Sequence, residues 1–179
     1  MHRSPLWCVE EGMRVPPAFI GALFLCGLAA PALAQTKVVG ATASDTIVGQ
    51  HVAQFVHSKI GTTVGRGECW DLAAEALTQA GAIWDGKYTW GALIDPEKEE
   101  VLPGDVVQFE NVVFEWEENN SLYRENMPHH TAVVLEVKDR GVFRIAHQNF
   151  GPLGRKVGLT ELVLAHKKKG KLMIYRPLR

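Results

Sequence analysis

An apolar segment near the start of the chain limits how much of it can fold as a globular domain. From Met13 the sequence reads MRVPPAFIGALFLCGLAAPALAQ, an arginine followed by an apolar run that ends in Ala-Leu-Ala. This order of charge, apolar run and small residues is typical of a secretory signal peptide. We therefore predict that residues 1–34 are a signal peptide cleaved after Ala34, with Met13 as an alternative translation start. The remaining 145 residues suffice for one domain with a proper core and not for two.

The apolar run does not have the pattern of a membrane span. Gly21, Gly27 and Pro31 interrupt it, and it stops at a cleavage-like site. The prediction is an exported protein, periplasmic or secreted, with no membrane span after cleavage. Residues 35–44 are small and polar enough to form a short linker, which leaves residues 45–179 as the folded domain.

Charge and cysteine content narrow the classes of partner. Removal of residues 1–34 leaves 17 basic and 18 acidic residues, so the net charge stays at −1 and nothing indicates binding to nucleic acid. The sequence carries no signal for oligomeric state. Cys8 and Cys26 fall in the predicted signal peptide, so Cys69 remains as one unpaired thiol, either reactive or intermolecular.

Periodicity in the rest of the chain predicts an α+β fold. Apolar residues at steps of three and four predict one helix from Asp45 to Ile60 and a second from Cys69 to Ala80, each followed by a glycine. Residues 102–110 read as a strand, and residues 130–137 and 141–150 as a hairpin joined by the turn KDRG. Residues 111–128 are interpreted as a strand extension followed by a surface loop that either lids a site or extends the sheet. A helix from about 160 to 169 and a strand over 171–177 complete the prediction.

Cys69 is the first candidate for chemistry. A thiol in the first turn of a helix faces unpaired backbone N–H groups and the positive end of the helix dipole, which favour thiolate over thiol. The same N–H groups can stabilise the oxygen that becomes negative when a carbonyl is attacked. The alternative is a small buried hydrophobic side chain, since free cysteines are among the most buried residue types.

Two histidines are placed to assist Cys69. His130 begins one strand of the predicted hairpin and His147 ends the other, so the two residues should lie side by side. In a Cys-His-His line, His130 takes the thiol proton and His147 fixes its tautomer. His129 is predicted to point to the opposite face and is the weaker base. A structural, hydrogen-bonded role is the alternative for each histidine.

Four blocks of sequence, in this order and spacing, resemble a known superfamily. They are the glycine-rich lead into Cys69 and Trp70, then PGDVVQF, HTAVVLEV and IAHQNFG. Over about residues 62–152 they are similar to the papain-like CHAP amidases and NlpC-type endopeptidases, which cut bacterial cell-wall peptides. The resemblance implies a papain-like fold, in which the nucleophile helix packs on a small antiparallel sheet. It also implies a cysteine hydrolase that needs no cofactor and no metal.

The resemblance also implies roles for individual residues. Cys69 matches the nucleophile, His130 the general base and His147 the polar third member. Asn149 matches an asparagine that orients or lines the site, and Trp70 and His129 are further candidates for substrate binding or orientation.

The sequence departs from the superfamily just before and just after the cysteine. Glu68 stands where CHAP enzymes commonly have glutamine, and an ionised carboxylate cannot donate a hydrogen bond to an oxyanion. The backbone N–H of Cys69 and an aromatic donor such as Trp90 are the substitutes we expect. Trp70 and Asp71 also differ from the usual continuation, which indicates a divergent branch.

These observations favour a cysteine peptidase or amidase that cleaves an amide bond through an acyl-enzyme. The predicted substrate is peptidoglycan or another peptide or amide. Acyl transfer on the same scaffold is the near alternative, because exclusion of water would divert the acyl-enzyme. Two alternatives from other classes are a metal-binding module, using Cys69, His130 and His147 with His129, and a catalytically silent cell-wall binder.

Overall fold

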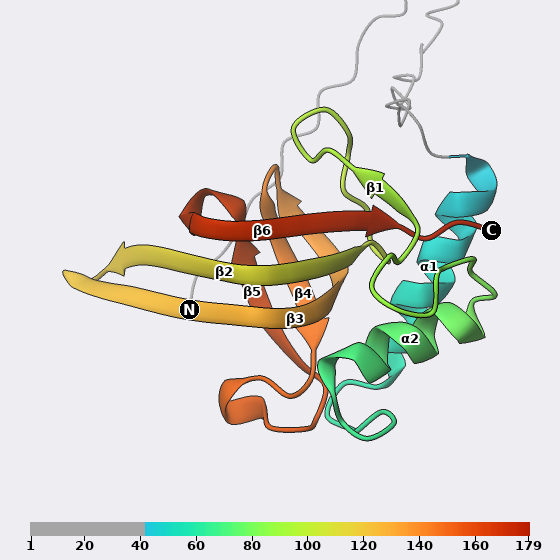
Figure 1. Ribbon diagram of the computed structural model, residues 1–179, viewed down its shortest axis with the longest axis horizontal. Coiled ribbons are helices and arrows are strands. Elements are labelled where there is room, and N and C mark those ends of the chain that lie inside the picture. Colours follow the sequence, from blue (N-terminus) through green and yellow to red (C-terminus); the bar gives the residue numbers. More distant parts are fainter. Residues whose placement is uncertain (1–41) are drawn as a thin grey trace, which may run out of the picture. The chain divides into compact units, whose positions relative to one another are not determined.

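The computed structural model describes residues 42–179, in which two helices precede a six-stranded sheet (Figure 1). Two three-residue 3₁₀ turns, η1 (Gly151–Leu153) and η2 (Leu164–His166), flank the fifth strand. The predicted signal peptide and most of the predicted linker lie outside the described residues. The helices and strands are α1 (Ala43–Ser58), α2 (Cys69–Gln79), β1 (Ala92–Ile94), β2 (Val106–Glu118), β3 (Ser121–Asp139), β4 (Val142–His147), β5 (Gly158–Val163) and β6 (Lys167–Arg176).

Helix α1 begins with a capping box rather than at the predicted Asp45 cap. The Thr42 hydroxyl accepts a hydrogen bond from the backbone N–H of Asp45 at 3.2 Å. The Asp45 carboxylate in turn accepts one from the backbone N–H of Thr42 at 3.1 Å. This reciprocal pair satisfies two N–H groups at the helix start. Val48, Val52 and Val56 then form the buried stripe, as their spacing predicts.

Helix α2 begins at Cys69, where the apolar spacing predicts it. Its buried face carries Leu72, Ala73, Ala76 and Leu77. Gly81, at φ +67°, follows the helix in the left-handed conformation that glycine adopts without strain. This face packs against α1 and β3, so the first residue of α2 lies beside the sheet.

The sheet is antiparallel throughout, in the order β1-β6-β2-β3-β4-β5. Strands β3 and β4 form the predicted hairpin, with Val133 opposite Ala146. The α+β class predicted from the sequence is confirmed. None of the helices in residues 42–179 is long and apolar enough to cross a membrane.

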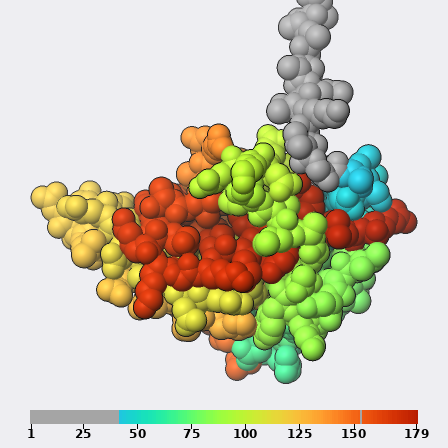
Figure 2. Space-filling view, turned by 45° about the horizontal axis from the view of Figure 1, so that its top comes forward, coloured from blue at the N-terminus to red at the C-terminus, as the bar shows by residue number. Residues whose placement is uncertain are grey.

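Residues 111–128 extend the sheet, which is one of the two roles left open for them, and the surface loop predicted for their second half is absent. Strands β2 and β3 stay paired out to Glu118 and Ser121. Asn119 and Asn120 form the two-residue connection with φ values of 50° and 58°. Asparagine tolerates this left-handed region, which suits a tight hairpin turn. The tip of the hairpin, yellow in Figures 1 and 2, extends beyond the neighbouring strand β6.

The helix predicted over residues 160–169 is wrong. Residues 158–163 form β5, which pairs with β4 along its length, and β6 begins at Lys167. The sequence TELVLAHKKK has good helix propensity, but an open edge of β4 offers a full ladder of hydrogen bonds and burial of Leu162. Tertiary pairing therefore overrides local preference.

Apolar side chains fill both faces of the sheet. Alternate residues of β2 and β3 point in opposite directions, so Val106 and Val133 face the helices while Val107 and Val134 face away. The helix side also holds the fully buried Trp90. The second cluster centres on Phe109, Phe114, Met127, Phe143, Ile145 and Leu162.

Candidate active site

A groove of about 540 Å³ lies at the start of α2, beside His129 and His130 in the middle of β3. Five of the six residues predicted from the sequence line it, and the sixth, His147, lies behind His130. The predicted site residues are therefore brought together. The lining comprises Arg66, Glu68, Cys69, Trp70, Gly86, Lys87, Tyr88, His129, His130 and Asn149.

The loop before Cys69 is shaped by its glycines. Gly65 and Gly67 have φ values of 56° and 85°, a region that L side chains rarely adopt. The turn lets the backbone N–H groups of Arg66 and Glu68 donate to the Asp71 carboxylate at 2.7 and 3.3 Å. The Asp71 side chain, which departs from the superfamily pattern, thus fixes the start of the helix.

Cys69 is a partly exposed free thiol at the first position of α2. Burial raises its pKa above the ordinary value, and the Glu68 carboxylate adds to the rise. Backbone N–H groups of Thr131, Trp70 and Cys69 act in the opposite direction and lower the pKa, but they do not outweigh burial. Burial therefore opposes the thiolate that the helix start was expected to favour. Cys69 is a thiol at neutral pH.

His130 is buried at the edge of the groove, with 6% of its surface exposed. Burial lowers its pKa to about 4, and a charge on His129 acts in the same direction. The imidazole is therefore neutral at pH 7. Its Nε2 lies 2.8 Å from Nδ1 of His147.

His147 is fully buried, and burial lowers its pKa to about 3. Its Nε2 lies 3.0 Å from the hydroxyl of Thr160 on β5. The line is self-consistent in two tautomer sets, and in the set that leaves a base at the groove His130 donates from Nε2 to His147, which donates from Nε2 to Thr160. Nδ1 of His130 is then left as an acceptor. Thr160 was missed in the sequence because its strand was taken for a helix.

The Glu68 carboxylate is engaged by two neighbouring side chains and cannot donate a hydrogen bond to an oxyanion. Its carboxylate forms an ion pair with Arg155 at 3.0 Å and accepts a hydrogen bond from the Asn149 amide at 2.6 Å. Asn149 therefore lines the groove and orients Glu68 rather than either histidine.

Gln148 is a further residue that the sequence did not single out. Its fully buried side-chain amide donates to the carbonyls of Val64 and Glu68 at 2.9 and 2.7 Å, and accepts from the N–H of Val64 at 3.1 Å. These bonds tie the loop before Cys69 to the end of β4. Both amide protons are used, so Gln148 supports the loop and does not face a substrate.

The aromatic side chains around the groove form one cluster. The Trp70 indole donates to the backbone carbonyl of Lys87 at 2.7 Å. The Trp90 indole donates to the Gln108 side chain at 3.2 Å inside the core, so the expectation that Trp90 supplies an oxyanion donor is wrong. His129 is exposed but still lines the groove, in edge contact with Tyr88 at 4.5 Å between ring centres.

The alternative of a metal centre finds no support in the arrangement of side chains. Within residues 42–179 no group of three or more histidine, cysteine, aspartate or glutamate side chains is placed to hold a metal ion. Nε2 of His130 and Nδ1 of His147 are instead hydrogen-bonded to each other, so one nitrogen of each ring is already occupied.

Comparison with known proteins identifies relatives of the whole described region. The family model described as "AIM3/BBC1 Cysteine proteinase-fold domain" matches residues 32–179. The chain is also 31% identical over 148 residues to Altered inheritance of mitochondria protein 3 of Debaryomyces hansenii. That alignment covers 73% of this chain and 16% of the relative, so the chain spans about a sixth of the relative's length. The cysteine proteinase relationship that the sequence resemblance implied is thus confirmed.

Two solved structures align with the chain at low similarity. Ly7917 is 17% identical with a TM-score of 0.44, over 72% of this chain and 62% of that protein. NlpC2 from Trichomonas vaginalis is 16% identical with a TM-score of 0.45, over 76% of this chain and 48% of that protein. Neither likeness is close enough to bear on function.

The prediction of export is contradicted. The relative from Debaryomyces hansenii is a yeast protein named for the inheritance of mitochondria, an intracellular process. A periplasmic or secreted location, inferred from the apolar run before Ala34, conflicts with this relationship. The apolar run itself lies outside the described residues.

Proposed function

Because the chain belongs to the AIM3/BBC1 cysteine proteinase-fold domain family, we propose that it is a cysteine hydrolase that cleaves an amide bond. One observation carries the proposal. Cys69, at the start of α2, shares a groove with His130, and a line of hydrogen bonds through His147 to Thr160 holds His130. His130 lines the same groove as this thiol, the arrangement that pairing a nucleophile with a base requires.

The first half of the reaction forms a thioester. Nδ1 of His130 takes the proton of the Cys69 thiol while the sulfur attacks the amide carbonyl carbon. The carbonyl oxygen becomes an oxyanion, and the backbone N–H of Cys69 at the helix start donates to it. His130 then gives its proton to the amide nitrogen, the C–N bond breaks, and the amine leaves.

The second half consumes water. His130 takes a proton from a water molecule, the hydroxide attacks the thioester carbon, and the C–S bond breaks as His130 returns the proton to the departing sulfur. The products are a carboxylic acid and the Cys69 thiol, so atoms and charge balance over the cycle. The exposed side chains of Tyr88, His129 and Asn149 leave the groove open to water, which favours hydrolysis over acyl transfer.

The substrate we propose is a peptide or related amide. Trp70 and Tyr88 supply apolar and aromatic lining, while Arg66, Lys87 and Glu68 supply charges of both signs. Such a mixed lining suits a peptide better than a strongly charged polymer. Peptidoglycan peptides follow from the resemblance of the sequence to cell-wall amidases, and they belong in a substrate panel as one class among several.

A second candidate, a binding module without catalysis, is favoured by two observations. The carboxylate of Glu68 stands where a donor to the oxyanion is expected, and the resting Cys69–His130 pair is neutral because burial acts on both pKa values. Proton transfer within this pair is uphill, and a site that only holds ligand would tolerate it.

The test is hydrolysis of a panel of fluorogenic peptide amides and of peptidoglycan fragments by the full chain. We expect release of new amino groups, loss of release in Cys69→Ala, and a fall of about 10²–10⁴-fold in His130→Ala. His57→Ala, at an exposed position of α1, is the matched control and should keep full activity. Binding of a panel member without turnover by the wild-type chain would replace the hydrolase with the binding module.

A further inference from the structure

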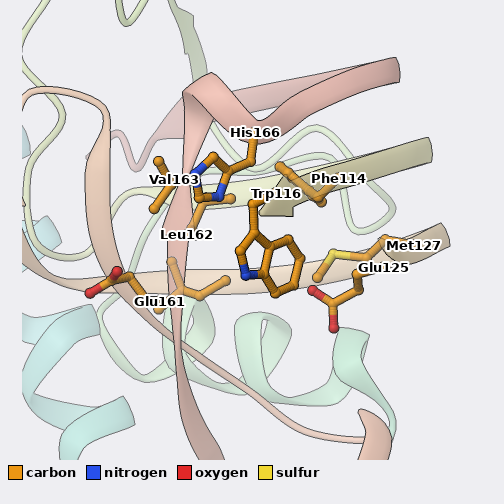
Figure 3. A pocket seen from close by; sticks show the side chains of 9 residues that line it. Phe114, Trp116, Glu125, Met127, Glu161, Leu162, Val163 and His166 are labelled. Atoms are coloured by element: carbon orange, nitrogen blue, oxygen red, sulfur yellow. The ribbon is translucent and has the colours of Figure 1, made fainter. Parts of the chain in front are cut away.

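A second cavity lies on the face of the sheet that points away from the helices (Figure 3). Its volume is about 170 Å³, and it shares no lining residue with the groove at Cys69. The long hairpin of β2 and β3 forms one side, and β4, β5 and η2 form the other. The lining comprises Phe114, Trp116, Glu125, Met127, Ile145, Glu161, Leu162, Val163 and His166.

Glu125 places an uncompensated carboxylate in this apolar cavity. It lies on β3 opposite Phe114, next to Met127 on the same face of the hairpin. Burial alone raises its pKa, and no cation or donor within residues 42–179 acts against the rise. A half-buried carboxylate without a partner is costly, so its place in the cavity points to a ligand that supplies the missing charge.

The second carboxylate of the lining does not share this property. Glu161 forms an ion pair with Lys138, which lowers the pKa of the Glu161 carboxyl group. In Figure 3 its carboxylate points away from Trp116, whereas that of Glu125 lies on the side of the indole ring. Glu125 is therefore the one unpaired anionic group among the side chains of the lining.

Trp116 gives the cavity a fixed aromatic wall. Its ring is nearly parallel to that of His166, at 5.8 Å between centres and 9°, and to that of Tyr123, at 5.4 Å and 12°. Stacking on both neighbours holds the indole in one orientation. The stacked indole therefore gives the cavity a rigid apolar wall beside the Glu125 carboxylate.

We propose that this cavity binds the side chain of a lysine from a partner polypeptide. The four methylene groups of lysine match the apolar lining of Met127, Ile145 and Leu162, and the ammonium group meets Glu125. A volume of about 170 Å³ admits one such side chain and not a folded segment. The proposal is independent of the chemistry at Cys69.

The binding test uses the full chain with ¹³C-labelled methionine methyl groups and nuclear magnetic resonance. The probe is Nα-acetyl-lysine methylamide, and its uncharged isostere Nα-acetyl-norleucine methylamide is the matched ligand control. We expect a saturable shift of the Met127 methyl signal with lysine alone, while the Met173 signal, from the helix side of the sheet, stays in place. Equal shifts with both compounds, or tighter binding of Nα-acetyl-arginine methylamide, would overturn the assignment to lysine.

Two variants separate the two carboxylates. Glu125→Gln should weaken lysine binding by at least about tenfold, because the charged partner is lost while the shape is kept. Glu161→Gln should change it by less than about twofold, since that carboxylate is already paired. Removal of an unpaired buried charge should leave the melting temperature of Glu125→Gln unchanged or raised, so loss of binding would not reflect unfolding. Equal binding by both variants would refute the site.

Discussion

Thr160 is the residue of the proposed catalytic site that the sequence did not predict. It terminates the hydrogen-bond line that runs from His130 through His147. If the hydroxyl fixes the tautomer of His147, its loss should affect the rate and not the binding of substrate. Thr160 touches no substrate and acts as a positioning residue.

We predict that Thr160→Val lowers kcat by roughly tenfold with little change in KM, because valine keeps the shape and removes the acceptor. Thr160→Ser should restore most of the rate, since it returns the hydroxyl. Steady-state kinetics on a substrate found in the amide panel give both parameters. A valine variant with unchanged kcat would show that the line of hydrogen bonds is structural.

The neutral Cys69–His130 pair makes a second residue-scale prediction. Burial raises the pKa of the thiol and lowers that of the imidazole to about 4, so little thiolate exists at pH 7. Alkylation by iodoacetamide should be slow at pH 7 and keep rising through pH 9, because only the thiolate reacts. Rapid alkylation at pH 7 that slows in His130→Ala would instead establish a thiolate–imidazolium pair.

Part of the site follows from the sequence, and part of it depends on pairing between distant segments. β3 begins at Ser121 and not at His130 as predicted, but His130 still lies on the strand that pairs with β4 through a short turn, so its closeness to His147 follows from the hairpin. Cys69 lies before a regular apolar stripe, which sets the helix start. Gln148 was missed because strand alternation stops at His147, and the partners of its side chain lie about 80 residues earlier.

At the scale of elements, β5 shows why local sequence was insufficient. Helix-forming residues after Thr160 favour a helix, but β4 would otherwise present an open edge. The consecutive residues Asn119 and Asn120 could have revealed the continuous β2–β3 hairpin, since two such residues in a row are a strong turn signal. The polar composition of residues 117–126 obscured this signal.

The two buried histidines on β3 and β4 predict how the free energy of unfolding depends on pH. Both histidines have pKa values in the folded chain below the ordinary 6.5, at about 4 and about 3. Between pH 6.5 and about 4 the unfolded chain binds protons that the folded chain does not, so the free energy of unfolding falls as the pH falls. Urea unfolding at pH 7.5 and pH 5 measures the change. His147→Asn should show a smaller difference between the two values, and an identical difference would contradict the assignment.

At the scale of the whole molecule, one buried ion pair joins the last strand to the turn before β2. Arg176 of β6 meets Asp105 at 2.9 Å, and both side chains are almost fully buried. Burial raises the pKa of Asp105 even though Arg176 acts in the opposite direction. Arg176 also donates to the backbone carbonyl of Glu100. The pair therefore fixes the loop that brings residues 95–105 back to the sheet.

We predict that Asp105→Asn destabilises the chain by about 3–5 kcal/mol, because it leaves the arginine charge buried without a counter-charge. Lys98→Ala, which removes the exposed pair with Asp95, should cost less than about 1 kcal/mol. Urea unfolding of the two variants gives the comparison. Similar losses in both would mean that the buried pair contributes no more than a surface one.

Formation of a covalent acyl-enzyme on Cys69 can be detected by intact mass spectrometry of the full chain. Turnover of a reactive amide from the panel is stopped with acid, which preserves a thioester, and the adduct is mapped by peptide digestion. We expect added mass equal to the acyl half of the substrate on the peptide that contains Cys69, and no adduct in Cys69→Ala. Turnover that persists in Cys69→Ala, or binding without any adduct in the wild-type chain, would contradict acyl-enzyme formation on Cys69.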